Sequence, residues 1–206
     1  MIIVVDYGVG NLGSIVNMFK KIGVKAEASS DPRVIEAAEK LVLPGVGAFD
    51  PGMGKLRERG LIPLLDRLVL VEKRPVIGLC LGLQLMTKGS AEGKEEGLGW
   101  LNARSPRFRF GAENSHLKVP HMGWNNIEIR KAHPLFVGLD AGSRFYFVHS
   151  YYVESGDADT ILAETEYGIR FHSVLGKDNI VGAQFHPEKS HRYGMQVLRN
   201  FAEWKP

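Results

Sequence analysis

The sequence contains one cysteine among its 206 residues, Cys80. A single thiol excludes an intrachain disulfide and is compatible with a reducing compartment. Long apolar runs are also missing, because none approaches the ~20 residues that cross a bilayer. The first apolar run stops at Asp6 and no basic segment precedes it, which argues against a secretory signal. We therefore expect a cytoplasmic protein with no membrane association.

A strong excess of charge is absent too, since 26 basic residues stand against 23 acidic ones and the net charge is +3. The densest basic stretch, 104–109, predicts a solvated strand face rather than a nucleic-acid stripe, because no other feature supports nucleic-acid binding. The seven histidines and one cysteine include no ligand pair at zinc spacing. We expect no metal and no nucleic-acid partner, and we assign no role to segment 104–118.

The first half of the chain alternates apolar runs with helical periodicity. Strands are expected over 1–6, 24–28, 40–43 and 75–79, and helices over 12–22, 32–40, 61–72 and 81–86. This alternation predicts a parallel sheet with right-handed crossovers. The second half has short strand-like runs over 126–129, 145–148, 161–165, 169–174 and 180–184, followed by a helix over 191–203. These runs predict hairpins that pack onto the sheet or extend it, so the fold class is α/β.

Three glycines follow the first expected strand with the G-x-G-x-x-G spacing of a dinucleotide-binding turn: Gly8, Gly10 and Gly13. Glu27 stands 19 positions after Gly8, close to where a ribose-binding carboxylate is sought. A nicotinamide-dependent oxidoreductase is therefore one hypothesis. It explains only this loop, and the rest of the chain barely leaves room for a catalytic domain. We expect no bound cofactor.

Cys80 lies in the pattern G-x-C-x-G, between an expected strand and an expected helix. This is the arrangement of a nucleophile elbow, in which a tight turn strains the nucleophile and flanking glycines relieve the crowding. The positive end of the following helix favours a thiolate, and main-chain N–H groups there are suited to an oxyanion. The alternative is a small buried cysteine at the end of a strand. The two flanking glycines favour the nucleophile interpretation over the buried structural cysteine.

A nucleophilic thiol needs a base and a group that orients the base. His186 and Glu188 follow an apolar strand-like run and are two positions apart, so in extended chain they point the same way. A carboxylate beside an imidazole fixes its tautomer and stabilises its charged form. The loop 44–47, Pro-Gly-Val-Gly, ends another expected strand. Because ligand sites in parallel sheets lie outside the carboxyl ends of the strands, we expect this loop and Cys80 to share one rim.

Two motifs, G-L-C-L-G followed by Gln84 and a late F-H-P-E, together resemble the class I (triad) glutamine amidotransferases over nearly the whole chain. The resemblance implies a flavodoxin-like three-layer fold with a mostly parallel sheet and added antiparallel strands. It also implies that Cys80 attacks the carboxamide of glutamine, with His186 as general base and acid and Glu188 orienting it. A γ-glutamyl thioester forms, ammonia leaves, and water regenerates the thiol.

Four further segments are similar to the HisH family of glutaminase subunits: DYGVGNLGS, LPGVGAF, VPHMGWN and FVHSY. This likeness implies a heterodimer with a (β/α)8-barrel cyclase of imidazole glycerol phosphate synthase. The cyclase uses the ammonia to make imidazole glycerol phosphate and an aminoimidazole carboxamide ribotide in histidine biosynthesis. A chain of this length fits one glutaminase domain over 1–206, without an acceptor domain.

The resemblance also implies roles for individual residues. An oxyanion site is implied at Gly45, Val46 and Leu81. The α-carboxylate and α-amino groups of glutamine are implied to bind Gln84, Glu92, Ser150 and Tyr151, and Glu95 and Glu96 remain alternatives to Glu92. The cyclase interface is implied to include Asn11, Trp124 and Lys189.

Two other interpretations stay open alongside the oxidoreductase. The chain could be a glutaminase subunit for another synthesis, such as that of purines or pyridoxal phosphate, although the segment PHMGWN argues against it. It could instead be a non-catalytic scaffold, in which case Cys80→Ala would have no effect.

Overall fold

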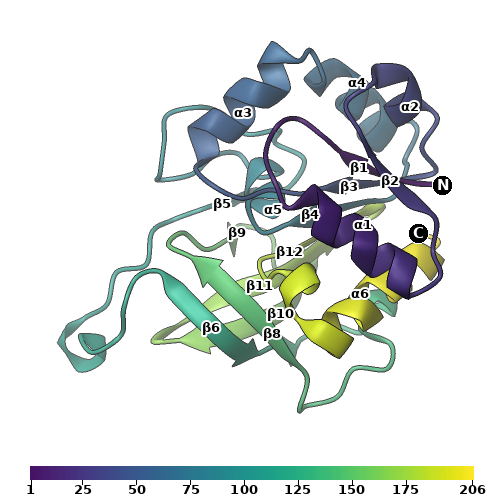
Figure 1. The fold of residues 1–206 in the computed structure, drawn as a ribbon. Coiled ribbons are helices and arrows are strands. Elements are labelled where there is room, and N and C mark those ends of the chain that lie inside the picture. The colour runs from purple at the N-terminus through teal and green to yellow at the C-terminus, as the bar shows by residue number, and fades with distance from the viewer.

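The computed structural model describes residues 1–206 and contains a central sheet of eight strands (Figure 1). Five strands are parallel: β1 (Ile2–Val5), β2 (Ala26–Ser29), β3 (Lys40–Leu43), β4 (Val76–Leu79) and β12 (Ile180–Ala183). Three antiparallel strands extend it: β7 (Glu128–Ile129), β10 (Ile161–Tyr167) and β11 (Ile169–Lys177). The order is β2-β1-β3-β4-β12-β11-β10-β7. The expected mostly parallel α/β sheet with antiparallel additions is confirmed.

Helices cover both faces of the sheet, as Figure 1 shows. One face carries α1 (Leu12–Lys21) and α6 (His191–Glu203). The other carries α2 (Pro32–Glu36), α3 (Phe49–Glu58), α4 (Ile62–Asp66) with the π-helix Arg67–Val71 that continues it, and α5 (Leu81–Leu85). Alternate residues of β1 enter the two cores, Ile2 and Val4 on one side and Ile3 and Val5 on the other. A strand buried on both faces needs this continuous apolar sequence.

Two small antiparallel pairs lie outside the central sheet. One joins β6 (His121–Asn126) to β8 (Arg144–His149), and the other joins β5 (Ala103–Arg104) to β9 (Glu154–Ser155). Short 3-10 helices occupy Ala112–Asn114, Pro134–Phe136, Ala158–Thr160 and Pro187–Lys189. The basic stretch 104–109 has exposed arginines but buries Phe108, which packs against the ring of His149.

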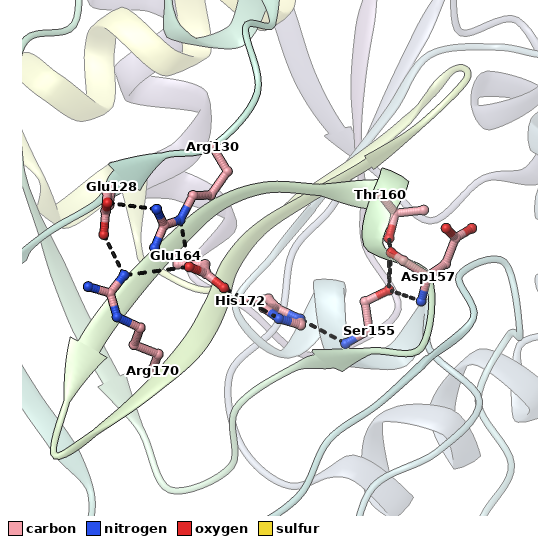
Figure 2. Close-up of polar contacts among 8 residues, drawn as sticks. All are labelled: Glu128, Arg130, Ser155, Asp157, Thr160, Glu164, Arg170 and His172. Carbon is pink, nitrogen blue, oxygen red and sulfur yellow. Dashed lines mark hydrogen bonds and ion pairs between the residues drawn. The ribbon is translucent and has the colours of Figure 1, made fainter.

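Charged side chains connect the three outer strands, as Figure 2 shows. Arg130 Nε lies 2.6 Å from Glu164 Oε2, and Arg170 Nη1 lies 2.5 Å from Glu128 Oε2. His172 Nδ1 accepts the main-chain N–H of Ser155 over 2.9 Å. Because most of these groups are solvated, each ion pair adds little stability. The hydrogen bond with Ser155 gives His172 a structural role. His172 does not line the cleft described below.

The structure corrects two expected helices and adds one that was not expected. One helix, α3, was not predicted, because Pro51, Gly52 and Gly54 weaken the helical signal of its sequence. Proline is tolerated in a first turn, and a Cβ at Gly52 would lie 3.3 Å from both Leu81 and Leu85. The helix expected over 32–40 ends at Glu36, since the chain must turn before β3 begins. The helix expected over 61–72 changes to π geometry after Asp66.

Candidate active site

Cys80 lies at the turn between β4 and α5, with φ +52° and ψ −107°. Its main-chain N–H donates to the carbonyl of Ala183 over 2.8 Å, which ties the turn to β12. Both flanking glycines are required. A Cβ at Gly78 would lie 2.8 Å from the nitrogen of Leu83, and one at Gly82 would lie 1.8 Å from the oxygen of Leu43. A strained, positive-φ cysteine between two such glycines is the geometry of a nucleophile elbow.

His186 and Glu188 follow β12, the strand beside β4 in the sheet. Ala183 is level with Leu79 in that pair, so the chain beyond β12 arrives next to Cys80. His186 Nδ1 lies 2.8 Å from Glu188 Oε1, and both side chains are nearly inaccessible to solvent, with 3% and 2% exposed. The structure therefore brings together the three residues of the expected triad.

The protonation of His186 is set by opposing effects. Burial by itself disfavours the imidazolium, but the negative charge of Cys80, a hydrogen bond with Cys80 and the carboxylate of Glu188 outweigh it. Together they raise the pKa of His186 to about 10. A histidine that holds its proton beside a sulfur and a carboxylate is prepared to transfer that proton.

A cleft of about 250 Å³ opens over Cys80 at the carboxyl ends of β3, β4 and β12. Its walls combine Cys80 and His186 with polar side chains from several loops. The lining residues are Val46, Gly47, Cys80, Leu81, Gln84, Glu92, Val148, His149, Tyr151, His186 and Lys189. Most of the residues expected at a glutamine site therefore meet in one hollow.

The loop after β3 packs tightly beside the cysteine turn. A Cβ at Gly45 would lie 2.7 Å from the Leu81 Cβ and 2.8 Å from the nitrogen of Gly82. The hydroxyl of Tyr7 donates to the carbonyl of Pro44 over 2.5 Å and fixes the position of this loop. Burial, with a smaller effect of Cys80, raises the pKa of Tyr7, so its hydroxyl remains a donor. Main-chain groups of this loop are thus held beside the nucleophile.

Polar contacts link the floor of the cleft to the sulfur. Gln84 Nε2 donates to the carbonyl of Tyr151 over 3.0 Å and to Gln184 Oε1 over 3.3 Å. The other end of that amide, Gln184 Nε2, lies 3.8 Å from Cys80 Sγ. Gln184 was not predicted as a site residue, and its place immediately after a strand and two residues before His186 was the available signal. Ser150 precedes Tyr151 and is not among the lining residues.

The structure separates the three candidate glutamates. Glu92 lines the cleft, where its Oε2 accepts the main-chain N–H of Phe49 over 2.9 Å. Glu95 instead forms an ion pair with Arg57 over 2.8 Å. Neither Glu95 nor Glu96 lines the cleft.

Asn11, Trp124 and Lys189 are exposed residues. Trp124 is 44% exposed and stacks on His191 with ring centroids 5.4 Å apart. Lys189 Nζ lies 5.6 Å above the ring of Tyr146. Asn11 stands at the N-cap position of α1, but its side chain makes no capping hydrogen bond. Asparagine is a favoured N-cap residue, but in this structure its amide makes no capping bond and is free for another contact.

The loop with the G-x-G-x-x-G spacing, residues 8–13, makes a tight turn after β1, with φ +93° at Gly8 and +112° at Gly10. Lys55 Nζ donates to the Gly8 carbonyl over 3.0 Å, and Arg59 donates to the Asp6 carbonyl. A Cβ at Gly8 would lie 3.2 Å from the Arg59 guanidinium. These side chains cover the main chain that a dinucleotide would have to approach.

No group of three or more potential metal ligands occurs among the histidine, cysteine and acidic side chains. No helix has the length and apolarity to cross a bilayer.

Comparison with known proteins agrees with this geometry. The family described as Glutamine amidotransferase class-I matches residues 3–204. The chain is 51% identical to imidazole glycerol phosphate synthase subunit HisH 2 of Pseudomonas aeruginosa, covering 98% of this chain and 99% of that one. It is 50% identical to the subunit HisH 2 of Methanococcus maripaludis, covering 98% of each.

Solved structures agree at the level of the fold. A PurLQS structure from Thermotoga maritima matches with a TM-score of 0.73 at 16% identity, over 98% of this chain and 97% of that one. A glutamine amidotransferase from the same organism matches with a TM-score of 0.66 at 18% identity, over 98% of this chain and 82% of that one. The chain belongs to the class I glutamine amidotransferase family and, within it, to the HisH subunits.

Proposed function

We propose that the chain hydrolyses glutamine to glutamate and ammonia with Cys80, His186 and Glu188 as its catalytic triad. The observation that carries the proposal is the buried His186–Glu188 pair, 2.8 Å long, beside a positive-φ cysteine at the end of the neighbouring strand. Such an arrangement supplies a nucleophile, a proton carrier and a group that orients the carrier.

The reaction begins when the Cys80 thiolate attacks the carboxamide carbon of glutamine. The carbon–nitrogen bond breaks as the imidazolium of His186 gives its proton to the leaving nitrogen, and ammonia departs. The neutral imidazole then removes a proton from water, and the resulting hydroxide attacks the thioester carbon. The carbon–sulfur bond breaks, which releases glutamate and restores the thiolate and the imidazolium.

Negative charge develops on the carboxamide oxygen during both attacks. The main chain of Gly45, Val46 and Leu81 is the proposed oxyanion site, because this loop and the cysteine turn are in contact. Gln84, Glu92, Ser150 and Tyr151 are the proposed partners of the α-carboxylate and α-amino groups. A carboxylate such as that of Glu92 suits the ammonium group of the substrate.

The relatives named as HisH subunits of imidazole glycerol phosphate synthase support a cyclase partner for this chain. We propose a heterodimer in which residues 1–206 are one glutaminase domain and ammonia passes to a (β/α)8-barrel cyclase. Asn11, Trp124 and Lys189 would face that partner. The free thiol on which the chemistry depends fits a reducing compartment, which supports a cytoplasmic location.

The deciding experiment measures ammonia release from glutamine by the wild type and by Cys80→Ala, with and without the cyclase and its ligand. We expect weak release by the wild type alone, a rise when the liganded cyclase is added, and none from the variant. Full activity of Cys80→Ala would refute the triad. Ammonia release that does not change when the liganded cyclase is added would refute the proposed cyclase partner.

A further inference from the structure

A buried pair of histidines on strands β6 and β8 adjoins the candidate site, and one of them, His149, lines the cleft. His121 and His149 face each other in register, and His121 Nδ1 lies 3.1 Å from His149 Nε2. The two residues are only 3% and 6% exposed. The outer nitrogens also have partners, since His149 Nδ1 is 2.8 Å from the Tyr151 carbonyl and His121 Nε2 is 3.3 Å from Asn125 Nδ2. Neither imidazole is used in the reaction described above.

The partners of the two imidazoles determine which ring nitrogen of each carries its proton. A carbonyl only accepts, so His149 Nδ1 carries the proton that it shares with Tyr151. Burial lowers the pKa of His149 to about 3, which leaves its Nε2 an acceptor at neutral pH. His121 Nδ1 is then the donor to that nitrogen, and the amide of Asn125 donates to His121 Nε2. Three donors, Asn125, His121 and His149, therefore form a chain that ends at the Tyr151 carbonyl.

The carbonyl at the end of this chain also contacts the glutamine site. The oxygen of Tyr151 accepts from Gln84 Nε2 over 3.0 Å, and both residues line the cleft with His149. Gln84 in turn contacts Gln184, whose amide lies 3.8 Å from Cys80 Sγ. The Tyr151 carbonyl is therefore held between two donors, one from the imidazole and one from a residue in contact with the cleft.

His149 cannot act as a second general base, although it shares the cleft with His186. Both of its ring nitrogens are engaged in hydrogen bonds, and the low pKa makes the unprotonated nitrogen, Nε2, a weak base. His186 differs in both respects, because its partner is a carboxylate and its pKa is raised. The two histidines in one cleft therefore have different tasks.

We propose that His149, held in place by His121, is a positioning residue for glutamine. Its Nδ1–H fixes the Tyr151 carbonyl and, through that carbonyl, the orientation of the Gln84 carboxamide in the cleft. The inference rests on the proposed glutaminase site and adds to it a determinant of substrate affinity. Because His149 acts on groups that bind the substrate, its loss weakens glutamine binding more than it slows the chemistry.

Two matched substitutions test the proposal in the full-length chain. His149→Asn places an amide nitrogen near the position of Nδ1 and keeps the donor to Tyr151. His149→Gln places it near Nε2 and loses that donor. We expect KM for glutamine to rise about tenfold in the glutamine variant and less than about threefold in the asparagine variant, with kcat changing less than about twofold in both.

Phe171→Leu is the packing control, because the Phe171 ring lies 5.2 Å from the His149 ring in the same cluster. It should leave KM within about twofold of the wild type. The rate at which iodoacetamide alkylates Cys80 should be equal in all of these proteins, since it does not depend on glutamine recognition. Equal KM values for the two His149 variants, or an equal rise in Phe171→Leu, would overturn the proposal.

A measurement on the wild type covers the case in which a His149 variant fails to fold. Nitrogen-15 NMR should identify both His149 and His121 as neutral Nδ1–H tautomers at pH 7. An Nε2–H tautomer at His149 would overturn the proposal without any substitution. A wild type that shows no Cys80-dependent ammonia release would instead refute the proposed function, so the two failures are distinguishable.

Discussion

Glu188 Oε1 accepts from His186 Nδ1 over 2.8 Å, and the two residues are separated by one proline at the start of a 3-10 helix. The second carboxylate oxygen, Oε2, is buried with no protein partner. The charge of this carboxylate is therefore compensated mainly by the imidazolium. This relationship supports the proposed catalytic role of Glu188, because the carboxylate has no other protein partner that it would serve.

Replacing Glu188 by glutamine should lower kcat for glutamine hydrolysis by about 10²- to 10⁴-fold, by analogy with the loss of the carboxylate in other triads. The amide keeps the size of the side chain but removes the charge that stabilises imidazolium. KM should change less than about threefold, because Glu188 does not line the cleft. Steady-state ammonia release tests this, and an unchanged kcat would show that the carboxylate is dispensable.

Glu92→Gln and Glu95→Gln form a matched pair on one loop. Only Glu92 lines the cleft, so its substitution should raise KM for glutamine about tenfold through loss of a charge-assisted contact with the substrate ammonium. Glu95→Gln should leave KM within about twofold, since it removes only the exposed ion pair with Arg57. Steady-state kinetics of both variants test which glutamate binds the substrate ammonium. A larger rise in KM for Glu95→Gln would assign that role to Glu95.

Gly45→Ala should disrupt the loop 44–47, which carries the proposed oxyanion site, because the new Cβ would lie 2.7 Å from the Leu81 Cβ. We expect kcat to fall at least about 100-fold, the scale of a lost oxyanion donor. The control is Gly54→Ala in α3, where a Cβ meets nothing within 4 Å. That variant should stay active and gain about 0.5–1 kcal/mol of stability. Normal turnover by Gly45→Ala would show that the loop does not need this close approach.

The buried histidines should make stability depend on pH. The native-state pKa values of His149 and His121, about 3 and about 4, lie below the usual 6.5, so the unfolded chain binds protons that the native state excludes. The free energy of unfolding should therefore fall as pH decreases from 7 to 5, by up to about 1.4 kcal/mol per pH unit for His149. Urea unfolding at both pH values measures this.

His149→Asn should reduce this pH dependence, since it removes one of the titrating groups. His116→Asn is the control, because His116 is exposed and its substitution should leave the dependence unchanged. Equal slopes in the wild type and in His149→Asn would contradict the assignment of the effect to this pair.

Asn11→Ala should weaken the rise in ammonia release caused by the cyclase and leave hydrolysis without the cyclase near the wild-type rate. Its side chain is exposed and makes no capping hydrogen bond, so the loss of unfolding free energy should be below about 0.5 kcal/mol. Asn17→Ala, also exposed on α1, is the control and should not alter the response. A reversed pattern, with only basal hydrolysis impaired, would remove Asn11 from the proposed interface.

The sequence was informative wherever one local pattern has one structural solution. The apolar run of β1 predicts a strand buried on both faces, and G-x-C-x-G predicts the elbow at Cys80. The sequence did not predict α3, because Pro51, Gly52 and Gly54 are typical of a loop. That helix depends on close packing of Gly52 against α5, a tertiary contact that no local propensity encodes.

The sequence alone was enough to propose Cys80, His186 and Glu188 as a triad, because a thiol nucleophile needs an imidazole and a carboxylate at suitable spacing. Only the tertiary structure shows that a second histidine, His149, shares the cleft with His186 and that the two have different partners. Parallel pairing of β12 with β4 brings His186 to the cysteine, whereas pairing of β8 with β6 engages His149 with His121. A histidine's chemistry depends on which groups occupy its two nitrogens, and those partners come from strands distant in sequence.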